Sequence, residues 1–323
     1  MNGEPAAIAT ATACGKVILL GEHAVVYGVP ALCGALARGV EVQVIPGEGR
    51  LLVPAWSVRT PTADQLLEGA ADSSLAQAYA AILRALPDAL QSPKDVDFRA
   101  NFALPTGAGL GSSAALAVAL VRALCIVGQP GLGRSLTAAE VDAAAFAAEQ
   151  VFHGQPSGLD HTVAQHGGFG LFRRGQGLSS IPRSPALSTL SLCIGHTGKA
   201  RDTKGRVARV AELYQQDQAA VRARFDRIAQ RVDDAVSALQ RGDLPALGAA
   251  MNENQAELRC LDVSCAEIET MCDLARRAGA LGCKLTGGGG GGCVVALAPG
   301  READVAAAWQ AAGFASFQVE VGS

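Results

Sequence analysis

The segment 107-GAGLGSS-113 places three glycines and two serines within seven residues. The alternating apolar run 96–104 before it predicts a strand, and the Ala-rich run 114–127 after it predicts a helix. Glycine lets backbone N–H groups approach an anion closely, and the first turn of a helix offers unpaired N–H donors. The segment therefore indicates a phosphate-binding turn, with plain packing as the alternative. It matches neither the P-loop pattern nor the dinucleotide-binding pattern.

A second glycine segment, 287-GGGGGG-292, separates two apolar runs that predict strands over 284–286 and 293–298. Six consecutive glycines weaken any regular element, because glycine loses the most backbone freedom on folding. Close approach of a ligand would explain the segment, and a flexible linker is the alternative. The strand-like residues on both sides favour the ligand interpretation.

Several charged residues have positions that suit phosphoryl-group chemistry. Glu149 stands near the end of a predicted helix and Asp160 lies eleven residues on, in the loop 153-HGQPSGLD-160, so the two carboxylates could converge on a metal–phosphate site. Lys16 precedes a short apolar run and is either a partly enclosed cation with a functional partner or a surface lysine at a strand end. The loop 196-HTGKARDTKGRV-207 holds four basic residues, which either clamp an anionic group or are simply solvated.

The remaining patterns exclude several functional classes. A net charge of −3 provides no excess positive charge to hold nucleic acid or an anionic membrane surface. The histidines lack the spacing of a zinc site, and no serine lies in the G-x-S-x-G turn of the hydrolases. We therefore expect neither a nucleic-acid-binding protein nor a zinc or serine hydrolase.

The composition predicts a folded, cytoplasmic protein. The 323 residues are 49% hydrophobic and 18% charged, as is typical of globular domains. Pro105 and nearby glycines interrupt the longest uncharged stretch, so no membrane-spanning helix is expected. No basic residue precedes the apolar N-terminal stretch, which argues against a signal peptide. The nine cysteines include no C-x-x-C pair, and we expect reduced core thiols.

The elements that must position these residues follow from the hydrophobic pattern, which predicts an α+β chain. The length indicates two domains, and the Ser- and Pro-rich stretch 179–188 is the best boundary, giving domains over 1–187 and 188–323. Helices are expected over 74–90, 114–127, 137–152, 203–240 (one helix or a broken pair), 245–258, 266–278 and a short stretch from 301. Strands are expected over 16–20, 40–45, 51–53, 96–104, 169–172, 190–194, 284–286, 293–298 and 316–321.

Three motifs, in order along the chain, resemble those of the GHMP kinase superfamily, small-molecule kinases named for galactokinase, homoserine kinase, mevalonate kinase and phosphomevalonate kinase. The segment 105-PTGAGLGSSAA-115 resembles its ATP-phosphate motif and 285-LTGGGGGGC-293 its C-terminal glycine motif. The segment 15-GKVILLGEHAVVYGVPA-31 resembles its N-terminal substrate motif. Within the superfamily, GEHAVVYG, HGQPSGLD and TGKARDT are most similar to segments of the mevalonate kinases.

The resemblance implies an N-terminal half like ribosomal protein S5 domain 2, a ferredoxin-like C-terminal half and an active site in the cleft between them. It implies transfer of the ATP γ-phosphate to the 5-hydroxyl of mevalonate, with Mg²⁺ on the nucleotide, in the mevalonate route to isoprenoids. The partners would be mevalonate and ATP, and a homodimer would be compatible with the family. A different acceptor such as phosphomevalonate, and a catalytically silent ATP-binding regulator, are the alternatives.

The resemblance also implies roles for individual residues. Asp160 would be the catalytic base, and Lys16 would orient it and stabilise the developing alkoxide. Ser113 and Glu149 would hold Mg²⁺. The substrate would be contacted by Glu22, His23, Arg201 and Thr203. The phosphates of ATP would be bound by Gly107, Ala108, Gly109, Leu110, Gly111, Ser112 and Ser113.

The chain departs from the family pattern at three positions. His161 follows the proposed base where asparagine is common, Gly288 replaces a common alanine in the third motif, and His196 stands where asparagine is common. None of these changes removes a group that the chemistry needs. His161 lies beside the base, so its presence leaves the identity of the acceptor open.

Overall fold

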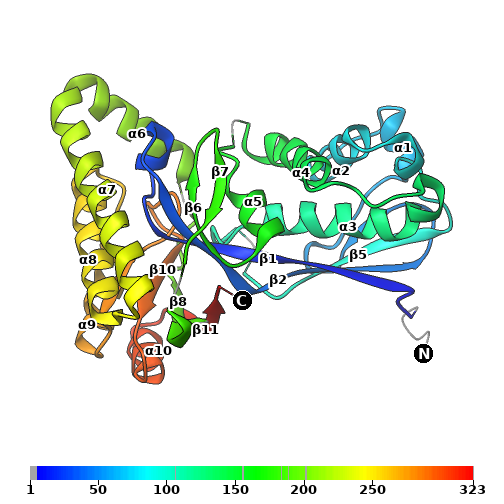
Figure 1. The fold of residues 1–323 in the computed structure, drawn as a ribbon. Helices are drawn as coiled ribbons and strands as arrows, with labels where there is room; N and C mark the ends of the chain where they lie inside the picture. Colours follow the sequence, from blue (N-terminus) through cyan, green and yellow to red (C-terminus); the bar gives the residue numbers. More distant parts are fainter. Residues whose placement is uncertain are drawn as a thin grey trace. The chain divides into compact units, whose positions relative to one another are not determined.

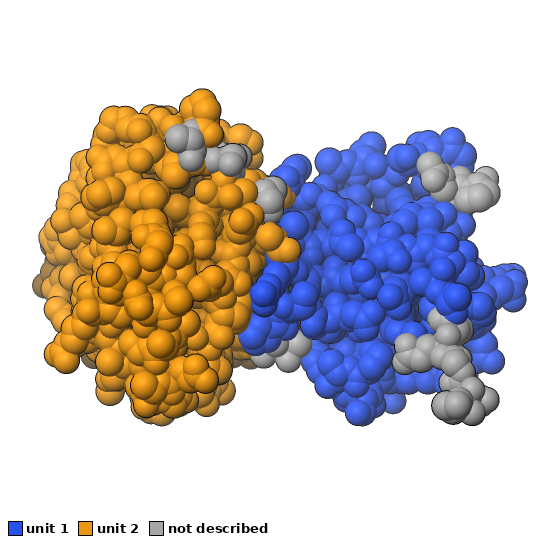
Figure 2. Space-filling view, turned by 90° about the horizontal axis from the view of Figure 1, so that it is seen from below, with its two compact units in different colours: residues 1–15, 38–105, 111–166 blue, residues 16–37, 106–110, 167–323 orange. Residues whose placement is uncertain are grey.

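The computed structural model describes residues 6–105, 107–154, 156–182, 184–187, 189–200 and 202–322. It divides into two compact units, which Figure 2 shows in different colours. Unit 1 comprises residues 1–15, 38–105 and 111–166, and unit 2 comprises residues 16–37, 106–110 and 167–323. The domain boundary near residue 187 stays a prediction.

Unit 1 combines a sheet with helices that lie along one side of its strands (Figure 1). Strand β2 pairs with β1 and, antiparallel, with β5; β5 pairs in parallel with β3, and β3 pairs antiparallel with β4. The strands are β1 (Ala9–Leu20), β2 (Ala31–Pro46), β3 (Leu51–Val53), β4 (Val58–Arg59) and β5 (Val96–Phe102), of which β1 and β2 also contribute residues to unit 2. The helices are α1 (Ala63–Leu67), α2 (Ser74–Ala85), α3 (Ser112–Leu132), α4 (Ala138–His153) and α5 (Leu159–His166), with 3-10 turns η2 (Pro54–Trp56) and η3 (Asp88–Leu90).

Unit 2 contains a second set of paired strands, in the order β9, β10, β8, β11 and β2, with β6 pairing to β2 and β7. The strands are β6 (Phe169–Arg173), β7 (Gly177–Ser180), β8 (Leu190–His196), β9 (Gly282–Leu285), β10 (Cys293–Leu297) and β11 (Ala315–Val321). The helices are α6 (Thr203–Gln216), α7 (Gln218–Arg241), α8 (Leu244–Cys260), α9 (Ala266–Arg277) and α10 (Glu302–Ala311), with 3-10 turns η1 (Ala24–Tyr27) and η4 (Pro185–Leu187). The expected α+β class is confirmed.

Helix ends follow the local chemistry of the chain. The helix expected over 137–152 is α4, and a capping box begins it: the Thr137 hydroxyl accepts from the N–H of Glu140, and the Glu140 side chain accepts from the N–H of Thr137. The expectation of one helix to residue 90 is wrong, because Leu86 is extended before Pro87, a position that disfavours helical backbone. The stretch 203–240 is a broken pair, with Asp217 capping the second helix.

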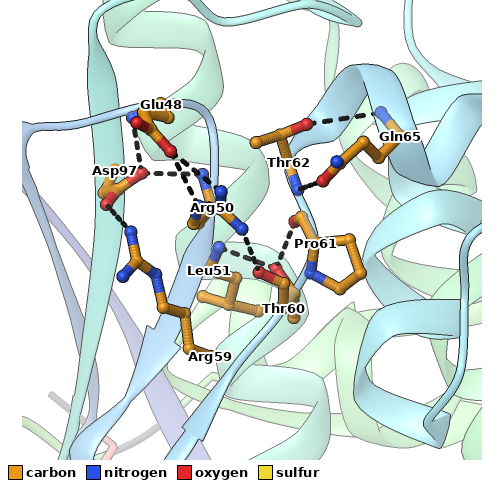
Figure 3. A network of polar contacts seen from close by, with 9 residues as sticks. All are labelled: Glu48, Arg50, Leu51, Arg59, Thr60, Pro61, Thr62, Gln65 and Asp97. Carbon is orange, nitrogen blue, oxygen red and sulfur yellow. Dashed lines mark hydrogen bonds and ion pairs between the residues drawn. The ribbon is translucent and has the colours of Figure 1, made fainter.

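The carboxylate of Asp97 organises the turn between β2 and β3 (Figure 3). Asp97 is 5% exposed, and its Oδ1 accepts from the backbone N–H groups of Glu48 and Arg50, each at 2.8 Å. A Cβ on Gly47 would overlap the Asp97 carboxyl group, so the close approach requires glycine. The hydroxyl of Thr60, directly after β4, accepts from the N–H of Leu51 at 3.0 Å. This bond joins the end of β4 to the start of β3.

Two further expectations concern cysteines and membranes. All nine cysteines are free thiols, as expected, but only five of them are buried in the core: Cys260 is exposed, and Cys14, Cys125 and Cys265 are partly exposed. In the part of the chain that the structure describes, no helix combines the length and apolar character needed to cross a bilayer.

Candidate active site

The glycine turn joins β5 to the start of α3 as expected. Gly107, Gly109 and Gly111 have φ angles of 73°, 87° and 75°, in the left-handed region that glycine adopts without strain. Helix α3 begins at Ser112, so the turn leads directly to the unpaired N–H groups of a helix N-terminus. This geometry suits an anion such as a phosphate group.

Lys16 is buried in unit 2, with 3% of its surface exposed, so the surface-lysine alternative is wrong. Its backbone N–H donates to the carbonyl oxygen of Leu110 at 2.8 Å. A Cβ built on Gly287 would lie 3.8 Å from the carbonyl oxygen of Gly109. Unit 2 therefore brings together Lys16, residues 107–110 of the first glycine segment and the start of the second.

The hexaglycine segment connects the antiparallel strands β10 and β9, so the linker interpretation is wrong. Other parts of the same chain, rather than a ligand, lie close to the hexaglycine segment. A Cβ on Gly288 would lie 2.5 Å from Oγ1 of Thr203 at the start of α6, and one on Gly289 would overlap the carbonyl oxygen of Val263. These glycines are needed for packing within unit 2, a use that the ligand interpretation did not include.

Thr203 lies where the N-terminus of α6 meets the hexaglycine segment. Its Oγ1 is buried and has no hydrogen-bond partner among the described residues, so the hydroxyl can still donate to a ligand. Arg201, its expected companion, lies outside the described residues.

Glu22 and His23 lie in the turn between β1 and η1 and are both buried, with 1% and 7% of their surfaces exposed. Glu22 forms an ion pair with Lys284, which is also fully buried, and accepts from Nδ2 of Asn254 at 3.2 Å. Burial raises the pKa of Glu22 and lowers that of Lys284, while their mutual attraction opposes both changes.

His23 lies 2.9 Å, through its Nε2, from the carbonyl oxygen of Gly288. Burial lowers the pKa of His23 to about 4, so its ring is neutral near pH 7. Because a carbonyl oxygen only accepts, Nε2 must carry the proton and Nδ1 must be a hydrogen-bond acceptor. Its backbone φ of 59° is in the left-handed region, which a non-glycine residue rarely adopts.

Unit 1 brings the two expected metal ligands to the same histidine. Nε2 of His153 lies 3.2 Å from Oγ of Ser113 and 3.7 Å from Oε2 of Glu149. Glu149 is 1% exposed. A hydroxyl and a carboxylate are hard oxygen donors, which is the set that Mg²⁺ prefers, so these residues fit the ion. The described residues contain no cluster of three or more His, Cys, Asp or Glu side chains that could hold a metal.

Asp160 lies in the first turn of α5, so the expectation that it stands in a loop is wrong. The helix forms because Gly158, with φ of 91°, turns the chain and the Ser157 hydroxyl accepts from the N–H of Leu159 at 3.3 Å. A short helix fixes the backbone of the carboxylate better than a glycine-rich loop would.

Polar contacts hold α5 to its neighbours in unit 1. Nε2 of His161 lies 3.1 Å from Oδ1 of Asp142 on α4. At the other end of α5, Arg122 of α3 donates to the carbonyl oxygen of Gln165 at 2.7 Å. Burial lowers the pKa of His161, so its ring is neutral near pH 7 and Nε2–H donates to the Asp142 carboxylate.

The motifs of the sequence do not include four further residues with polar contacts near the site, Lys284, Asn254, Asp142 and Arg122. Lys284 had one usable signal, a charged residue inside an apolar run that predicts a buried strand. Asn254, Asp142 and Arg122 stand in helices with nothing in their spacing to distinguish them from surface residues.

Comparisons with known proteins identify the family. The model of the GHMP kinases N-terminal domain matches residues 73–168, and the model of the GHMP kinases C-terminal domain matches residues 235–315. The chain therefore belongs to the GHMP kinases, and it is an enzyme that transfers phosphoryl groups.

Within this family, several curated relatives are mevalonate kinases. The enzyme of Pyrococcus horikoshii is 34% identical over 318 residues, which cover 94% of this chain and 92% of the relative. The enzyme of Aeropyrum pernix is 35% identical, with 90% and 88% covered. The crystal structure of L. major mevalonate kinase in complex with R-mevalonate superposes with a TM-score of 0.81 at 30% identity and covers 98% of both chains. The Methanococcus jannaschii mevalonate kinase has the same TM-score at 21% identity, a likeness that concerns the fold alone.

Proposed function

We propose that this chain is an ATP-dependent mevalonate kinase, which converts mevalonate and ATP to 5-phosphomevalonate and ADP. The observation that carries the proposal is its similarity to curated mevalonate kinases over 94% of its length. The contacts of Lys16 with Leu110 and of His23 and Thr203 with Gly288 support it, because they place residues with a cation, an acceptor and a donor beside the two glycine segments, as a small anionic alcohol requires.

The proposed roles follow what phosphoryl transfer requires, namely positioning and neutralisation of oxygen charge. Asp160 accepts the proton of the attacking 5-hydroxyl group. Lys16 orients that carboxylate and stabilises negative charge on the attacking oxygen. The N–H groups of 107–113 bind the phosphate oxygens of ATP.

Ser113 and Glu149 are the residues that would hold Mg²⁺. The ion, when bound, neutralises negative charge on the phosphate groups. Both side chains offer only oxygen atoms to the ion. Because Glu149 is buried, water screens the attraction between its carboxylate and a cation less than it would at the surface.

Recognition of mevalonate falls to residues of unit 2. Nδ1 of His23 accepts a hydrogen bond from a substrate hydroxyl, and Oγ1 of Thr203 donates one to an oxygen of the substrate or the transferring phosphate. Arg201 pairs with the mevalonate carboxylate. The cytoplasmic location, the homodimer and the absence of membrane and nucleic-acid partners stay predictions of the sequence.

Acceptor-dependent ADP release tests this function. The purified protein is given MgATP and, separately, mevalonate, phosphomevalonate, homoserine, galactose or no acceptor. Selective turnover with mevalonate is expected. Turnover with another acceptor would keep the kinase and replace the substrate, and ATP binding without ADP release would favour the regulator.

The base assignment is tested with Asp160→Asn, which keeps the shape of the side chain. The variant is expected to lose essentially all turnover while it still binds a fluorescent ATP analogue. Near-normal turnover would show that another group accepts the proton.

A further inference from the structure

Three contacts join two segments that are far apart in the sequence, residues 18–23 and residues 284–288, within unit 2. The backbone N–H and C=O of Ile18 both bond to Oγ1 of Thr286, at 3.1 and 3.0 Å. Glu22 forms its ion pair with Lys284. His23 bonds to the carbonyl oxygen of Gly288 at 2.9 Å. The first segment ends in the expected substrate-binding pair, and the second leads into the hexaglycine segment.

Both carboxylate oxygens of Glu22 are already engaged by the protein. Oε1 accepts from Nζ of Lys284, and Oε2 accepts from Nδ2 of Asn254 on α8 at 3.2 Å. Nζ of Lys284 also donates to the carbonyl oxygen of Leu285 at 2.5 Å. Glu22, Lys284 and Asn254 are each no more than 1% exposed. A carboxylate that is 1% exposed and holds a protein donor on each oxygen is poorly placed to contact a substrate.

A buried ion pair of this kind contributes little net stability, because the desolvation of two charges offsets their attraction. The ion pair does, however, fix the positions of Glu22 and Lys284 relative to each other, because each buried charge needs the other close by. Glu22 directly precedes His23, whose left-handed backbone conformation needs its neighbours to be held. Fixing Glu22 therefore fixes the direction in which the His23 ring is presented.

We propose that Glu22 and Lys284 are positioning residues, and that their ion pair sets His23 and the start of the hexaglycine segment for mevalonate binding while Glu22 makes no substrate contact. Lys284 becomes a residue required for acceptor recognition although it is fully buried. This inference rests on the proposed mevalonate kinase activity.

The test compares Glu22→Gln, Lys284→Met and the double variant with the wild-type enzyme. KM for mevalonate, KM for ATP, kcat and the thermal unfolding temperature are measured for each. The double variant leaves no unpaired buried charge, so it is the variant expected to fold if Lys284→Met does not. Arg227→Met is the matched control, because Arg227 also pairs with a glutamate, Glu257, between helices of unit 2.

Each variant of the pair is expected to lower kcat/KM for mevalonate about 10- to 100-fold, the range that a small misplacement of a binding group produces. KM for ATP should change less than about twofold. Because both residues act through one ion pair, the double variant should be no worse than the poorer single variant. Arg227→Met should leave both KM values unchanged.

Three results would overturn the inference. Losses that add in the double variant would show that Glu22 acts on the substrate by itself. A lower kcat with both KM values unchanged, together with a lower unfolding temperature, would show a purely structural pair. Wild-type values in the folded double variant would show that the pair is dispensable. If the wild-type enzyme does not turn over mevalonate, the proposed function fails first, and the inference fails with it.

Discussion

His161 and Asp142 connect the helix that carries the proposed base to the helix that carries a proposed metal ligand. Nε2 of His161, on α5, donates to Oδ1 of Asp142, on α4, at 3.1 Å. Asp160 precedes His161, and Glu149 lies two turns after Asp142 on the same helix. The His161 side chain is 2% exposed, whereas that of Asp142 is 44% exposed. The buried side chain of His161 therefore attaches α5 to the partly exposed Asp142 of α4.

Removal of the Asp142 carboxylate is expected to impair both stability and turnover. Asp142→Ala leaves the buried Nε2–H of His161 without an acceptor, which costs about 1–3 kcal/mol of unfolding free energy. Without this contact α5 is expected to shift and to carry Asp160 with it. The shift should lower kcat about tenfold or more, with little change in either KM. Urea unfolding and steady-state kinetics measure the two effects. Asp72→Ala, at an exposed position of unit 1, is the control, and equal behaviour of both variants would contradict the role of Asp142.

Acid should destabilise the protein through His23. Burial lowers the pKa of His23 from 6.5 to about 4, so between these values the unfolded chain binds a proton that the folded chain does not. Stability is therefore lost as the pH falls through this window, by on the order of 2–3 kcal/mol for this group. The difference in unfolding free energy between wild type and His23→Gln, measured from pH 7 to pH 4, isolates it. A difference that does not vary with pH would contradict the buried neutral ring.

Loss of either proposed metal ligand should weaken the response to Mg²⁺. Ser113→Ala removes an oxygen donor, and Glu149→Gln removes the negative charge of one. For each variant the Mg²⁺ concentration for half-maximal activity should rise about tenfold, the lower end of the effect seen when a metal site loses a supporting group. A titration of activity with MgCl₂ at fixed ATP measures this, with Gln150→Ala, exposed on α4, as control. An unchanged titration for both variants would remove them from the metal site.

The turn around Asp97 should matter for stability and not for chemistry. Asp97→Ala leaves the N–H groups of Glu48 and Arg50 without their acceptor, and each hydrogen bond to a charged group contributes about 1.5–3 kcal/mol, so the two together contribute about 3–6 kcal/mol. Urea unfolding should show a loss in this range, while kcat/KM of the folded variant should stay within about twofold of wild type. A stable but inactive variant would be the opposite of what is expected.

The sequence predicted elements well where local chemistry and tertiary packing agree. The capping box at Thr137 sets the start of α4, and the continuous apolar run 293–298 corresponds to the buried strand β10. Helix α5 was missed because its residues Leu-Asp-His-Thr-Val-Ala-Gln-His show little apolar periodicity and follow a Gly- and Pro-containing loop. Contacts from Arg122 and Asp142 hold it, and such contacts leave no local pattern.

The candidate site was predictable to the extent that its residues belong to continuous motifs. The turn 107–113 has the backbone angles and the helix start that its glycines and serines indicate. The hexaglycine segment was only half explained, because its close contacts with Thr203 and Val263 come from distant parts of the chain. The partner of Glu22 was not predictable, since 262 residues separate it from Lys284.

The γ-phosphoryl group of ATP is expected to pass to a hydroxyl of mevalonate, and ³¹P NMR of the reaction detects this transfer directly. The wild-type protein, MgATP and mevalonate should give ADP and, in equal amount, a new phosphomonoester resonance. Asp160→Asn under the same conditions should give neither. Release of inorganic phosphate in place of the monoester would contradict transfer to mevalonate, and a monoester that forms equally well with Asp160→Asn would contradict Asp160 as the base.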